Sequence, residues 1–480
     1  MIRVYFDWNV VSNLKRPEFS ELNNFIEEHK EKLLFPYSPA HFRDLMKSYS
    51  PDNIHFNTDL EKLNYLSGKH LIRWGKDGIE PLFGTPQEYF QEEELHTETN
   101  FIEAFDFDKL FSDLDENSKE LGLENIGAAI KNMFQLLPTG ITITEENKEM
   151  LSKMFPNLDN NSTMWDFMKD FGPFTQNLLQ DGDYYKDFRK TLGDTGFKLE
   201  ANAGNWSEEE VIDNIDKFLL SLNSNMTFIE YVETSLKHRK EPYTKYDFYT
   251  TAYLMLDMIG YKSDKLPKPT DNMQNIQADA DHSFYGAHCD YFVAMDKKLM
   301  VKSKVLYNKF NIPVKVLTPE EFLNDIRQVI HDRNNIQNFL EEILSFCTNE
   351  NIVETHPASE ENEIGTHAFK LPIFYFDFFN YVTYQFYEKE KFIFLVFKRV
   401  FKNYSRFIYY TEIEKVIDKV CDFFGYEDKE ELEQKKKEFA YGDSSIEFSW
   451  QYDRGIIKLK KDEETKRPIL VYVIKVVDEN

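Results

Sequence analysis

Four aspartates have the residue type and the positions in the sequence that suit metal-dependent chemistry. Asp7 ends a short apolar stretch at the start of the chain, and Asp296 follows a second such stretch much later. Asp44 and Asp279 lie in segments that have helical spacing. Carboxylates that meet at one point repel one another unless a cation lies between them, and oxygen ligands suit Mg²⁺ or Mn²⁺. These four aspartates are therefore the candidate catalytic and metal-binding residues.

Residues beside the aspartates are candidates for steadying a ligand or holding a substrate. Asp281 is a reserve metal ligand, although an aspartate at this place more often caps a helix. The two candidate histidines lie near Asp44 and Asp279, and histidines are more often packed, hydrogen-bonded residues than substrate contacts. The candidates for substrate binding are Asn9, His41, His282, Lys297 and Lys298.

The elements that must position these residues form a βαβαβ pattern. Strands are expected at 2–7, 33–35, 291–295 and 313–317, and helices at 18–32, 39–47 and 297–309. Asp279 or Asp281 is expected to begin a further helix. Ligands gather beyond the carboxyl ends of the strands in an open parallel sheet, near the point where strand order reverses. Asp7 and Asp296 are expected at that edge.

The pattern is split into three domains. The α/β domain takes residues 1–50 and 266–333, and a large α-helical insertion takes 51–265. Residues 334–480 are expected to form a small α+β domain with an antiparallel sheet, because aromatic and β-branched runs alternate there with two helical segments.

Composition restricts the compartment and the partners. The three cysteines have no paired spacing, which favours a reducing compartment, and no signal segment or bilayer-spanning run is visible, so a cytoplasmic protein without membrane contact is expected. A net charge of −27 disfavours binding of nucleic acid over a large surface. A nuclease on this chain must therefore concentrate its lysines locally. Three basic clusters could do this, although each is more simply solvated surface: 237–240, 297–304 and 398–406.

Four segments together resemble a PIN-like nuclease domain. They cover parts of residues 1–48 and 270–330, and they are Tyr5-Phe6-Asp7-Trp8-Asn9, Ser38-Pro39-Ala40-His41-Phe42-Arg43-Asp44, Asp279-Ala280-Asp281-His282 and Cys289-Asp290-Tyr291-Phe292-Val293-Ala294-Met295-Asp296. The resemblance implies a doubly wound, mainly parallel α/β sheet and metal-dependent phosphodiester hydrolysis, usually of RNA.

The family's acidic ligands match positions of this chain one by one. Asp7 matches the first, Asp44 the second (where the family often has glutamate), Asp279 the third and Asp296 the fourth. The family usually has threonine and a small polar residue where this chain has Ala294-Met295, so a substrate-positioning hydroxyl is missing.

The expected function is that of a PIN-like endoribonuclease that uses Mg²⁺ or Mn²⁺, with a toxin-like or phage-defence role by family analogy. The insertion and the C-terminal domain would set substrate choice, restrain activity, or bind a protein partner or a second copy of the chain. Two alternatives stay open: a nuclease for DNA or a structured junction, and a non-catalytic interaction protein with a degenerate PIN-like site.

Overall fold

The fold is described from a computed structural model of the 480-residue chain. The description covers all residues except 48, 50–53, 76–77, 93–106, 108–125, 146, 195–197, 200, 223–225, 238–241, 266–271, 331–337, 359–363, 388–390, 427, 442–445, 454 and 476–480. Most of the basic cluster at 237–240 and the three expected domain boundaries lie outside the described residues.

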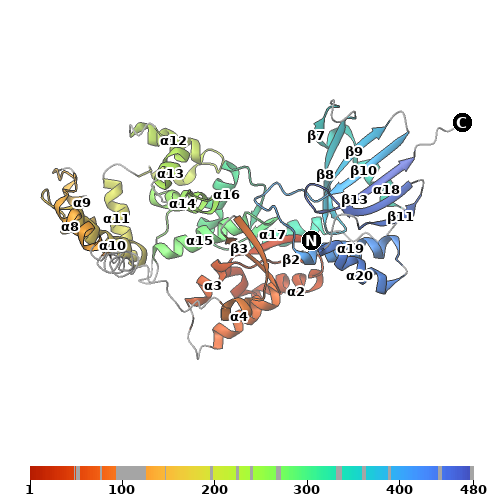
Figure 1. The fold of residues 1–480 in the computed structure, drawn as a ribbon, viewed down its shortest axis with the longest axis horizontal. Helices are drawn as coiled ribbons and strands as arrows, with labels where there is room; N and C mark the ends of the chain where they lie inside the picture. The colour runs from red at the N-terminus through yellow and green to blue at the C-terminus, as the bar shows by residue number, and fades with distance from the viewer. Residues whose placement is uncertain are drawn as a thin grey trace.

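A four-stranded parallel sheet forms the centre of the molecule (Figure 1). Its strands are β1 (Ile2–Phe6), β2 (Leu33–Leu34), β5 (Tyr291–Val293) and β6 (Lys315–Leu317), in the order β2-β1-β5-β6. After β1 the chain adds β2 on one side and then crosses to add β5 on the other. The strand order therefore reverses between β1 and β5, and both strands have their carboxyl ends at the same edge.

Alternate residues of β1 point into two different cores. Val4 and Phe6 belong to one apolar cluster, whereas Tyr5 belongs to the other. Helices cover both faces, as expected for a doubly wound sheet. The helices of this α/β domain are α1 (Trp8–Asn13), α2 (Ser20–His29), α3 (Pro39–Met46), α15 (Met273–Gly286), α16 (Lys297–Lys309) and α17 (Pro319–Val329).

The insertion between α3 and α15 is mostly helical but also contains a hairpin. The hairpin pairs β3 (His70–Gly75) with β4 (Gly78–Phe83), and its Ile72 amide donates to the Tyr37 carbonyl beside the parallel sheet. The sequence predicted an α-helical insertion and did not predict this hairpin. Its helices are α4 (Ile54–Ser67), α5 (Pro86–Glu92), α8 (Ile126–Leu136), α9 (Lys148–Met154), α10 (Met164–Gln180), α11 (Gly182–Asp194), α12 (Val211–Ser221), α13 (Phe228–Leu236) and α14 (Lys245–Met258).

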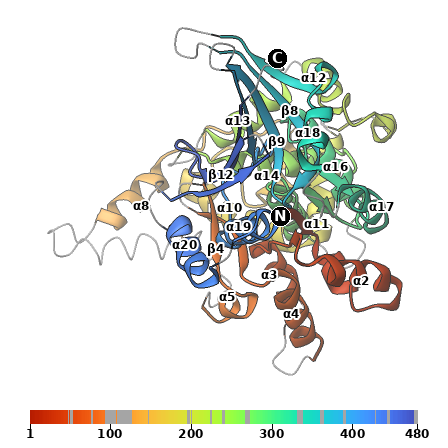
Figure 2. The same cartoon turned by 90° about the vertical axis from the view of Figure 1, so that its right-hand side faces the viewer.

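The C-terminal domain is an antiparallel sheet with helices on one face, at the opposite end of the molecule from α8 to α11 (Figure 1). The expected α+β class is confirmed. The sheet order is β11-β12-β13-β10-β9-β8-β7, and Figure 2 shows this sheet nearest the viewer. The elements are α18 (Phe339–Phe346), β7 (Ile352–His356), β8 (Thr366–Tyr375), β9 (Phe379–Tyr387), β10 (Phe392–Lys398), α19 (Tyr410–Phe424), α20 (Lys429–Tyr441), β11 (Phe448–Tyr452), β12 (Gly455–Lys461) and β13 (Pro468–Lys475).

Buried charges join the C-terminal domain to the α/β domain. Arg3 of β1 pairs with Glu412 of α19 at 2.6 Å, and both side chains are almost completely buried. Arg399, directly after β10, pairs with Asp290, directly before β5, at 2.6 Å. Removing one partner of such a pair leaves a buried charge uncompensated, which costs about 3–5 kcal/mol. The two sheets are therefore held in a fixed relation.

One sequence expectation about a helix start was wrong. Neither Asp279 nor Asp281 begins a helix, because α15 starts six residues earlier, with Asn272 as its N-cap accepting a 2.9 Å bond from the Gln274 amide. Both aspartates therefore lie in the interior of α15. Within the described ranges, the chain has no helix with the length and apolar content needed to cross a bilayer.

Candidate functional site

The site lies at the carboxyl ends of β1 and β5, where the strand order reverses. Asp7 follows β1 directly, and its amide donates to the Val293 carbonyl at the end of β5, 2.9 Å away. The extended backbone of Asp7 then turns into α1, whose Val10 and Val11 amides donate to the Asp7 carbonyl. The backbone of Asp7 is thus fixed between two strands, with its side chain buried at the edge of the sheet.

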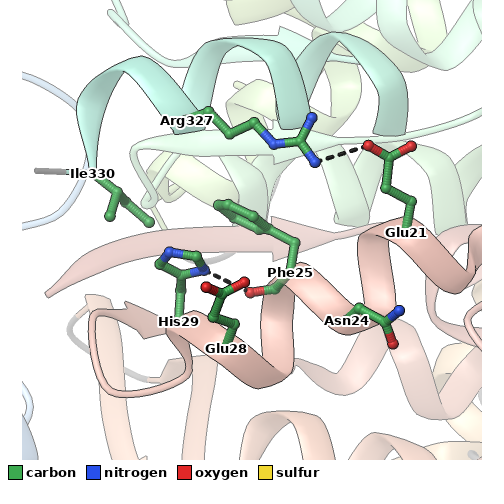
Figure 3. A pocket seen from close by; sticks show the side chains of 7 residues that line it. All are labelled: Glu21, Asn24, Phe25, Glu28, His29, Arg327 and Ile330. Carbon is green, nitrogen blue, oxygen red and sulfur yellow. Dashed lines mark hydrogen bonds and ion pairs between the residues drawn. The ribbon is translucent and has the colours of Figure 1, made fainter.

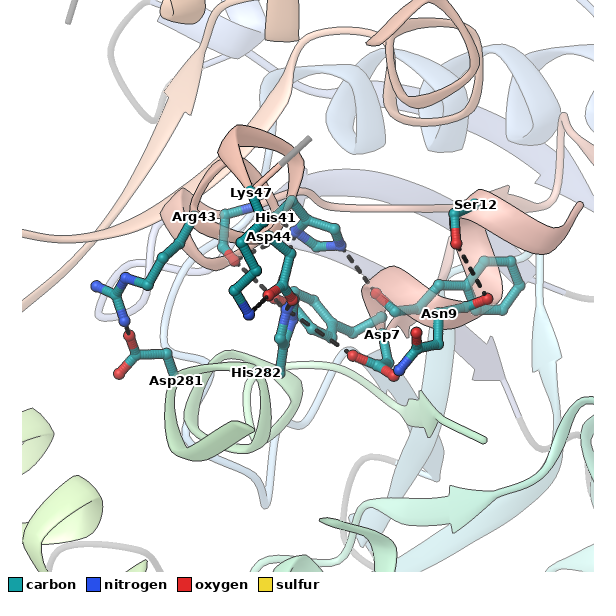
Figure 4. Close-up of polar contacts among 12 residues, drawn as sticks. Asp7, Asn9, Ser12, His41, Arg43, Asp44, Lys47, Asp281 and His282 are labelled. Carbon is teal, nitrogen blue, oxygen red and sulfur yellow. Dashed lines mark hydrogen bonds and ion pairs between the residues drawn. The ribbon is translucent and has the colours of Figure 1, made fainter. Parts of the chain in front are cut away.

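Three of the candidate side chains meet at this edge. One ligand atom from each of Asp7, Asp44 and His282 lies within 4.8 Å of the others. The His282 Nε2 atom lies 2.9 Å from an Asp44 oxygen and 3.8 Å from an Asp7 oxygen. The three residues come from β1–α1, α3 and α15, and Figure 4 shows them pointing toward one another. Tertiary structure has brought together residues up to 275 positions apart.

A hydroxyl network fixes His282 from behind. An ionised Asp44 carboxylate can only accept, so the 2.9 Å contact places the proton on His282 Nε2. His282 Nδ1 then accepts from the Tyr5 hydroxyl at 2.9 Å, and that hydroxyl oxygen lies 2.6 Å from Ser38 Oγ. Such partners behind an imidazole set its tautomer and its orientation.

His41 is placed for a structural role. Its Nδ1 accepts from the Ser38 amide at 3.1 Å, and its Nε2 donates to the Phe6 carbonyl at 2.8 Å. Burial, together with the neighbouring His282, lowers the pKa of His41 to about 3, so the ring is neutral. Since the side chain is buried and both nitrogens have protein partners, His41 supports the sheet edge and does not face a substrate.

Asp7 and Asp44 have opposite electrostatic surroundings. Burial raises the pKa of Asp7, and the Asp44 charge adds to this, while His282 opposes it. Burial alone would also raise the pKa of Asp44, but the hydrogen bond and charge of His282, together with Lys47, lower it overall. Lys47 Nζ lies 2.6 Å from Asp44 Oδ1.

The outer oxygen of Asp7 fits a cation ligand. Asp7 is 2% exposed, and its Oδ2 atom has no hydrogen-bond partner within the described part of the chain. Buried polar atoms are rarely left unpaired, so an unpaired one needs an explanation. Two carboxylates and an imidazole are a donor set that divalent transition metals accept, and Mn²⁺ tolerates both ligand types. The residues present therefore fit a divalent cation.

Asp279 lies close enough to the Asp7–Asp44–His282 group for the Asp7 charge to change its pKa. Burial raises the pKa of Asp279 well above its ordinary range, and the carboxylates of Asp264, Asp7 and Asp296 raise it further. The buried Lys302 ammonium acts in the opposite direction. Asp279 is therefore near Asp7 and Asp296 in space, although it is outside the group of three whose ligand atoms meet.

Asp296 is placed as an exposed helix cap. Its Oδ1 atom accepts from the Lys298 amide at 2.7 Å and from the Leu299 amide at 3.0 Å, at the start of α16. A capping bond of this kind stabilises a helix by about 1 kcal/mol. The side chain lies at the rim, with its charge acting on Asp279, and it does not join the group of three.

The reserve ligand Asp281 has a different role from the one expected. Its buried carboxylate pairs with Arg43 and accepts from the Tyr246 hydroxyl at 2.7 Å and the Gln277 amide at 2.8 Å. Asp281 therefore ties α15 to α3 and to the insertion, and its oxygens are already satisfied. It neither caps a helix nor faces Asp7.

The expected polar neighbours lie at the rim of the site. Asn9 is exposed at the second residue of α1, and its side chain favours the ionised form of Asp7. Lys298 donates to the Ser263 carbonyl at 2.6 Å and pairs with Asp264 at 3.2 Å, so the insertion already holds it. Lys297 is exposed.

Lys302 belongs to the basic cluster 297–304 that was a candidate for holding phosphates, but in the structure it is buried beside the site. Its side chain is completely buried, and its Nζ lies 3.3 Å from Asp257 and 3.1 Å from Asp264. Burial lowers the pKa of Lys302, but the two carboxylates and Asp279 raise it overall, so the ammonium stays charged. Helical spacing could have predicted this burial, because Lys302 lies between Leu299 and Val305 on the apolar side of α16.

A separate hollow lies between α2 and α17, away from these residues (Figure 3). The Glu21–Arg327 ion pair of 2.8 Å spans it, and the rings of Phe25 and His29 stack at 4.3 Å along its wall. None of its lining residues belongs to the site.

Comparison of the chain with protein-family models, with curated proteins and with solved structures gives no match.

Proposed function

We propose that the protein is a metal-dependent nuclease of the PIN-like type that hydrolyses phosphodiester bonds, with RNA as substrate. The observation that supports this best is the meeting of Asp7, Asp44 and His282 at the switch point of a doubly wound sheet, with one Asp7 oxygen buried and unpaired in the described structure. The PIN-like resemblance adds the reaction type and the substrate class.

In this proposal Asp7, Asp44 and His282 hold the cation, and Asp279 and Asp296 extend the acidic site toward the rim. A bound Mn²⁺ or Mg²⁺ would supply Lewis acidity and positive charge against the phosphodiester. Tyr5 orients His282 through its Nδ1 atom. Lys47, half exposed beside Asp44, is free to turn from the carboxylate to a substrate phosphate. The imidazole favours Mn²⁺ over Mg²⁺.

One observation favours a second candidate function, that of a non-catalytic interaction protein. Asp44 is already neutralised by Lys47 and hydrogen-bonded by His282, and Asp296 is used as a helix cap, so much of the acidic charge has protein partners. A site closed in this way would hold its shape without a metal. Metal binding separates the two functions.

The deciding experiment measures Mn²⁺ binding by calorimetry and cleavage of a labelled single-stranded RNA by the full chain. Asp7→Asn is expected to abolish both. Asp281→Asn is the matched control, because it also neutralises a buried aspartate but one that is held by Arg43 and Tyr246. The control is expected to lose stability and to keep Mn²⁺ binding. Unchanged RNA cleavage by Asp7→Asn would overturn the nuclease assignment.

A DNA oligonucleotide of the same sequence, tested beside the RNA, distinguishes the substrate. Preferential cleavage of DNA would replace the ribonuclease by the DNA nuclease, and cleavage of neither, without Mn²⁺ binding, would favour the interaction protein.

A further inference from the structure

The C-terminal sheet has a charge pattern unlike the rest of the chain. The chain contains 84 Asp and Glu residues and has a net charge of −27. Strands β8, β9, β10, β11, β12 and β13 contain no Asp or Glu, although they contain several lysines. Within so acidic a chain, six neighbouring strands without a carboxylate are suited to a polyanion, and only the edge strand β7 carries one, Glu354.

The two faces of this sheet differ in what covers them. Leu395 and Phe397 of β10 are completely buried, in one cluster with Val416 and Ile417 of α19. The alternating residues Phe394, Val396 and Lys398 point to the opposite face and are half-buried, as expected for side chains that are flanked by neighbouring strands but not covered.

Lysines and aromatic rings share that open face. We call it the lysine–aromatic face and define it by Lys370, Tyr387, Phe394, Lys398, Lys458 and Lys460. The strand register places them together: Phe394 pairs with Gln385 and Val473, Lys458 with Val471, and Lys370 and Lys398 both with Tyr381. The rings of Tyr387 and Phe394 lie 4.9 Å apart.

The positive charge of this face is only partly compensated, since Lys398 interacts electrostatically with Asp462 without forming an ion pair. Lys458 pairs with Glu447, at the margin before β11, at 2.6 Å. For Lys370, Lys398 and Lys460 the described residues provide no ion pair. Lysines beside aromatic rings on an open sheet are the elements with which proteins hold single-stranded nucleic acid, where the rings stack on bases and the lysines neutralise phosphates.

We propose that the lysine–aromatic face binds single-stranded RNA and holds it relative to the Asp7–Asp44–His282 site. The proposal names where the substrate is held, and in that respect it rests on the proposed function. Arg399 supports the connection, since it follows β10 of this face and pairs at 2.6 Å with Asp290, which precedes β5 of the site. A strand of the binding surface and a strand of the site are thus joined by one ion pair.

The test measures binding of a fluorescein-labelled oligouridine to the full chain by anisotropy, at two salt concentrations. The chain carries Asp7→Asn, so that the RNA stays intact. Phe394→Ala is expected to weaken binding about tenfold, because one stacked base is lost. Lys398→Ala with Lys458→Ala is expected to lower the slope of log Kd against log salt by about 1.4, from two phosphate contacts.

The matched control removes two lysines from the insertion. Lys169→Ala with Lys217→Ala changes the net charge by the same amount as Lys398→Ala with Lys458→Ala. Both control lysines are exposed, one on α10 and one on α12. The control is expected to keep the Kd within about twofold. Circular dichroism checks folding, and the lysine variant decides the matter if Phe394→Ala unfolds.

Equal affinity of the lysine variant and its control would overturn the proposal, as would binding of anionic lipid vesicles without binding of oligouridine. The nuclease assignment fails separately. If oligouridine binding depends on this face while cleavage does not depend on Asp7, the RNA-binding assignment of the face is supported and the nuclease assignment of the Asp7 site is wrong.

Discussion

His282 Nε2 lies 2.9 Å from Asp44 Oδ2, and these two residues are 238 positions apart in the chain. This contact closes the site, because it joins α3, which precedes the insertion, to α15, which follows it. The same nitrogen lies 3.8 Å from Asp7. A cation that binds between the three residues must displace the proton that His282 now shares with Asp44, and the imidazole is then expected to carry its proton on Nδ1, beside the Tyr5 hydroxyl.

Asp7→Asn is expected to raise stability while it abolishes metal binding. Asp7 is buried with a raised pKa and an unpaired oxygen, so its ionised form costs free energy in the folded protein. Removing this charge is expected to increase the free energy of unfolding by about 1 kcal/mol at pH 7. Urea unfolding of wild type and variant without metal measures this. A large loss of stability would mean that the ionised Asp7 side chain makes stabilising contacts in the folded protein.

The increase in the free energy of unfolding that Asp7→Asn produces is expected to depend on pH. A raised pKa in the folded state means that the folded protein binds more protons, so the stability that Asp7 contributes falls as pH rises through the folded pKa. The advantage of the variant is therefore expected to grow from pH 4 to pH 7. An advantage of the same size at both values would contradict the assigned cause.

Tyr5→Phe is expected to weaken metal binding without touching a metal ligand. The Tyr5 hydroxyl donates to His282 Nδ1, and it can accept from that atom when Nε2 is occupied by a metal, with Ser38 as its second partner. Losing such a support typically lowers metal affinity 10- to 100-fold. Calorimetry with Mn²⁺ measures it, and stability is expected to fall by about 1 kcal/mol. Ser38→Ala, one hydroxyl further from His282, is expected to have a smaller effect on affinity.

Lys302→Met is expected to destabilise the protein by about 1–3 kcal/mol, because the Asp257 and Asp264 carboxylates each lose one of their two cations. The network around Lys302 contains three cations, Arg189, Lys298 and Lys302, and two carboxylates, Asp257 and Asp264. One positive charge is therefore in excess, and it acts on Asp279.

A double-mutant cycle tests the role of Lys302. Lys302→Met and Asp264→Asn together are expected to cost less stability than the sum of their separate effects, because the ion pair that the two residues share is lost only once. Lys304→Met is the control, since Lys304 lies on the same helix and makes a half-exposed 3.7 Å contact with Glu208. Strictly additive effects of Lys302→Met and Asp264→Asn would show that the two charges do not interact.

Acid is expected to weaken the contact between the two sheets. Burial alone would raise the pKa of Glu412, but Arg3 lowers it overall to about 2 from an ordinary 4.5. A lowered carboxyl pKa contributes stability that is present above the unfolded pKa and is lost as pH falls toward the folded one, here about 3 kcal/mol between pH 5 and pH 2.

The comparison of wild type with Glu412→Gln isolates this contribution. The free energy of unfolding is expected to be lower in the variant by about 3–5 kcal/mol at pH 7, because Arg3 stays buried without its partner. The difference is expected to shrink as pH falls to 3. A difference that stays constant with pH would mean that ionisation of Glu412 does not hold the domains together.

The sequence by itself determined most elements of the α/β domain, although α1 was not predicted and the start of α15 was placed too late. Apolar runs that end in Asp7 and before Asp296 predicted β1 and β5, and Ser38-Pro39 predicted the start of α3. Local preferences and hydrophobic period are sufficient for this, since both act over a few residues. The antiparallel C-terminal sheet followed from β-branched and aromatic runs for the same reason.

Tertiary structure decided which acidic residues meet and which are used elsewhere. Asp281 and Asp279 are two residues apart on one helix, but Arg43 and Tyr246 hold the first, and the second faces Lys302 and the site. His282, which the sequence suggested as a substrate contact, lies against Asp44 because α15 packs on α3. The physical reason is that pairing and burial depend on contacts across more than two hundred residues, which periodicity does not encode.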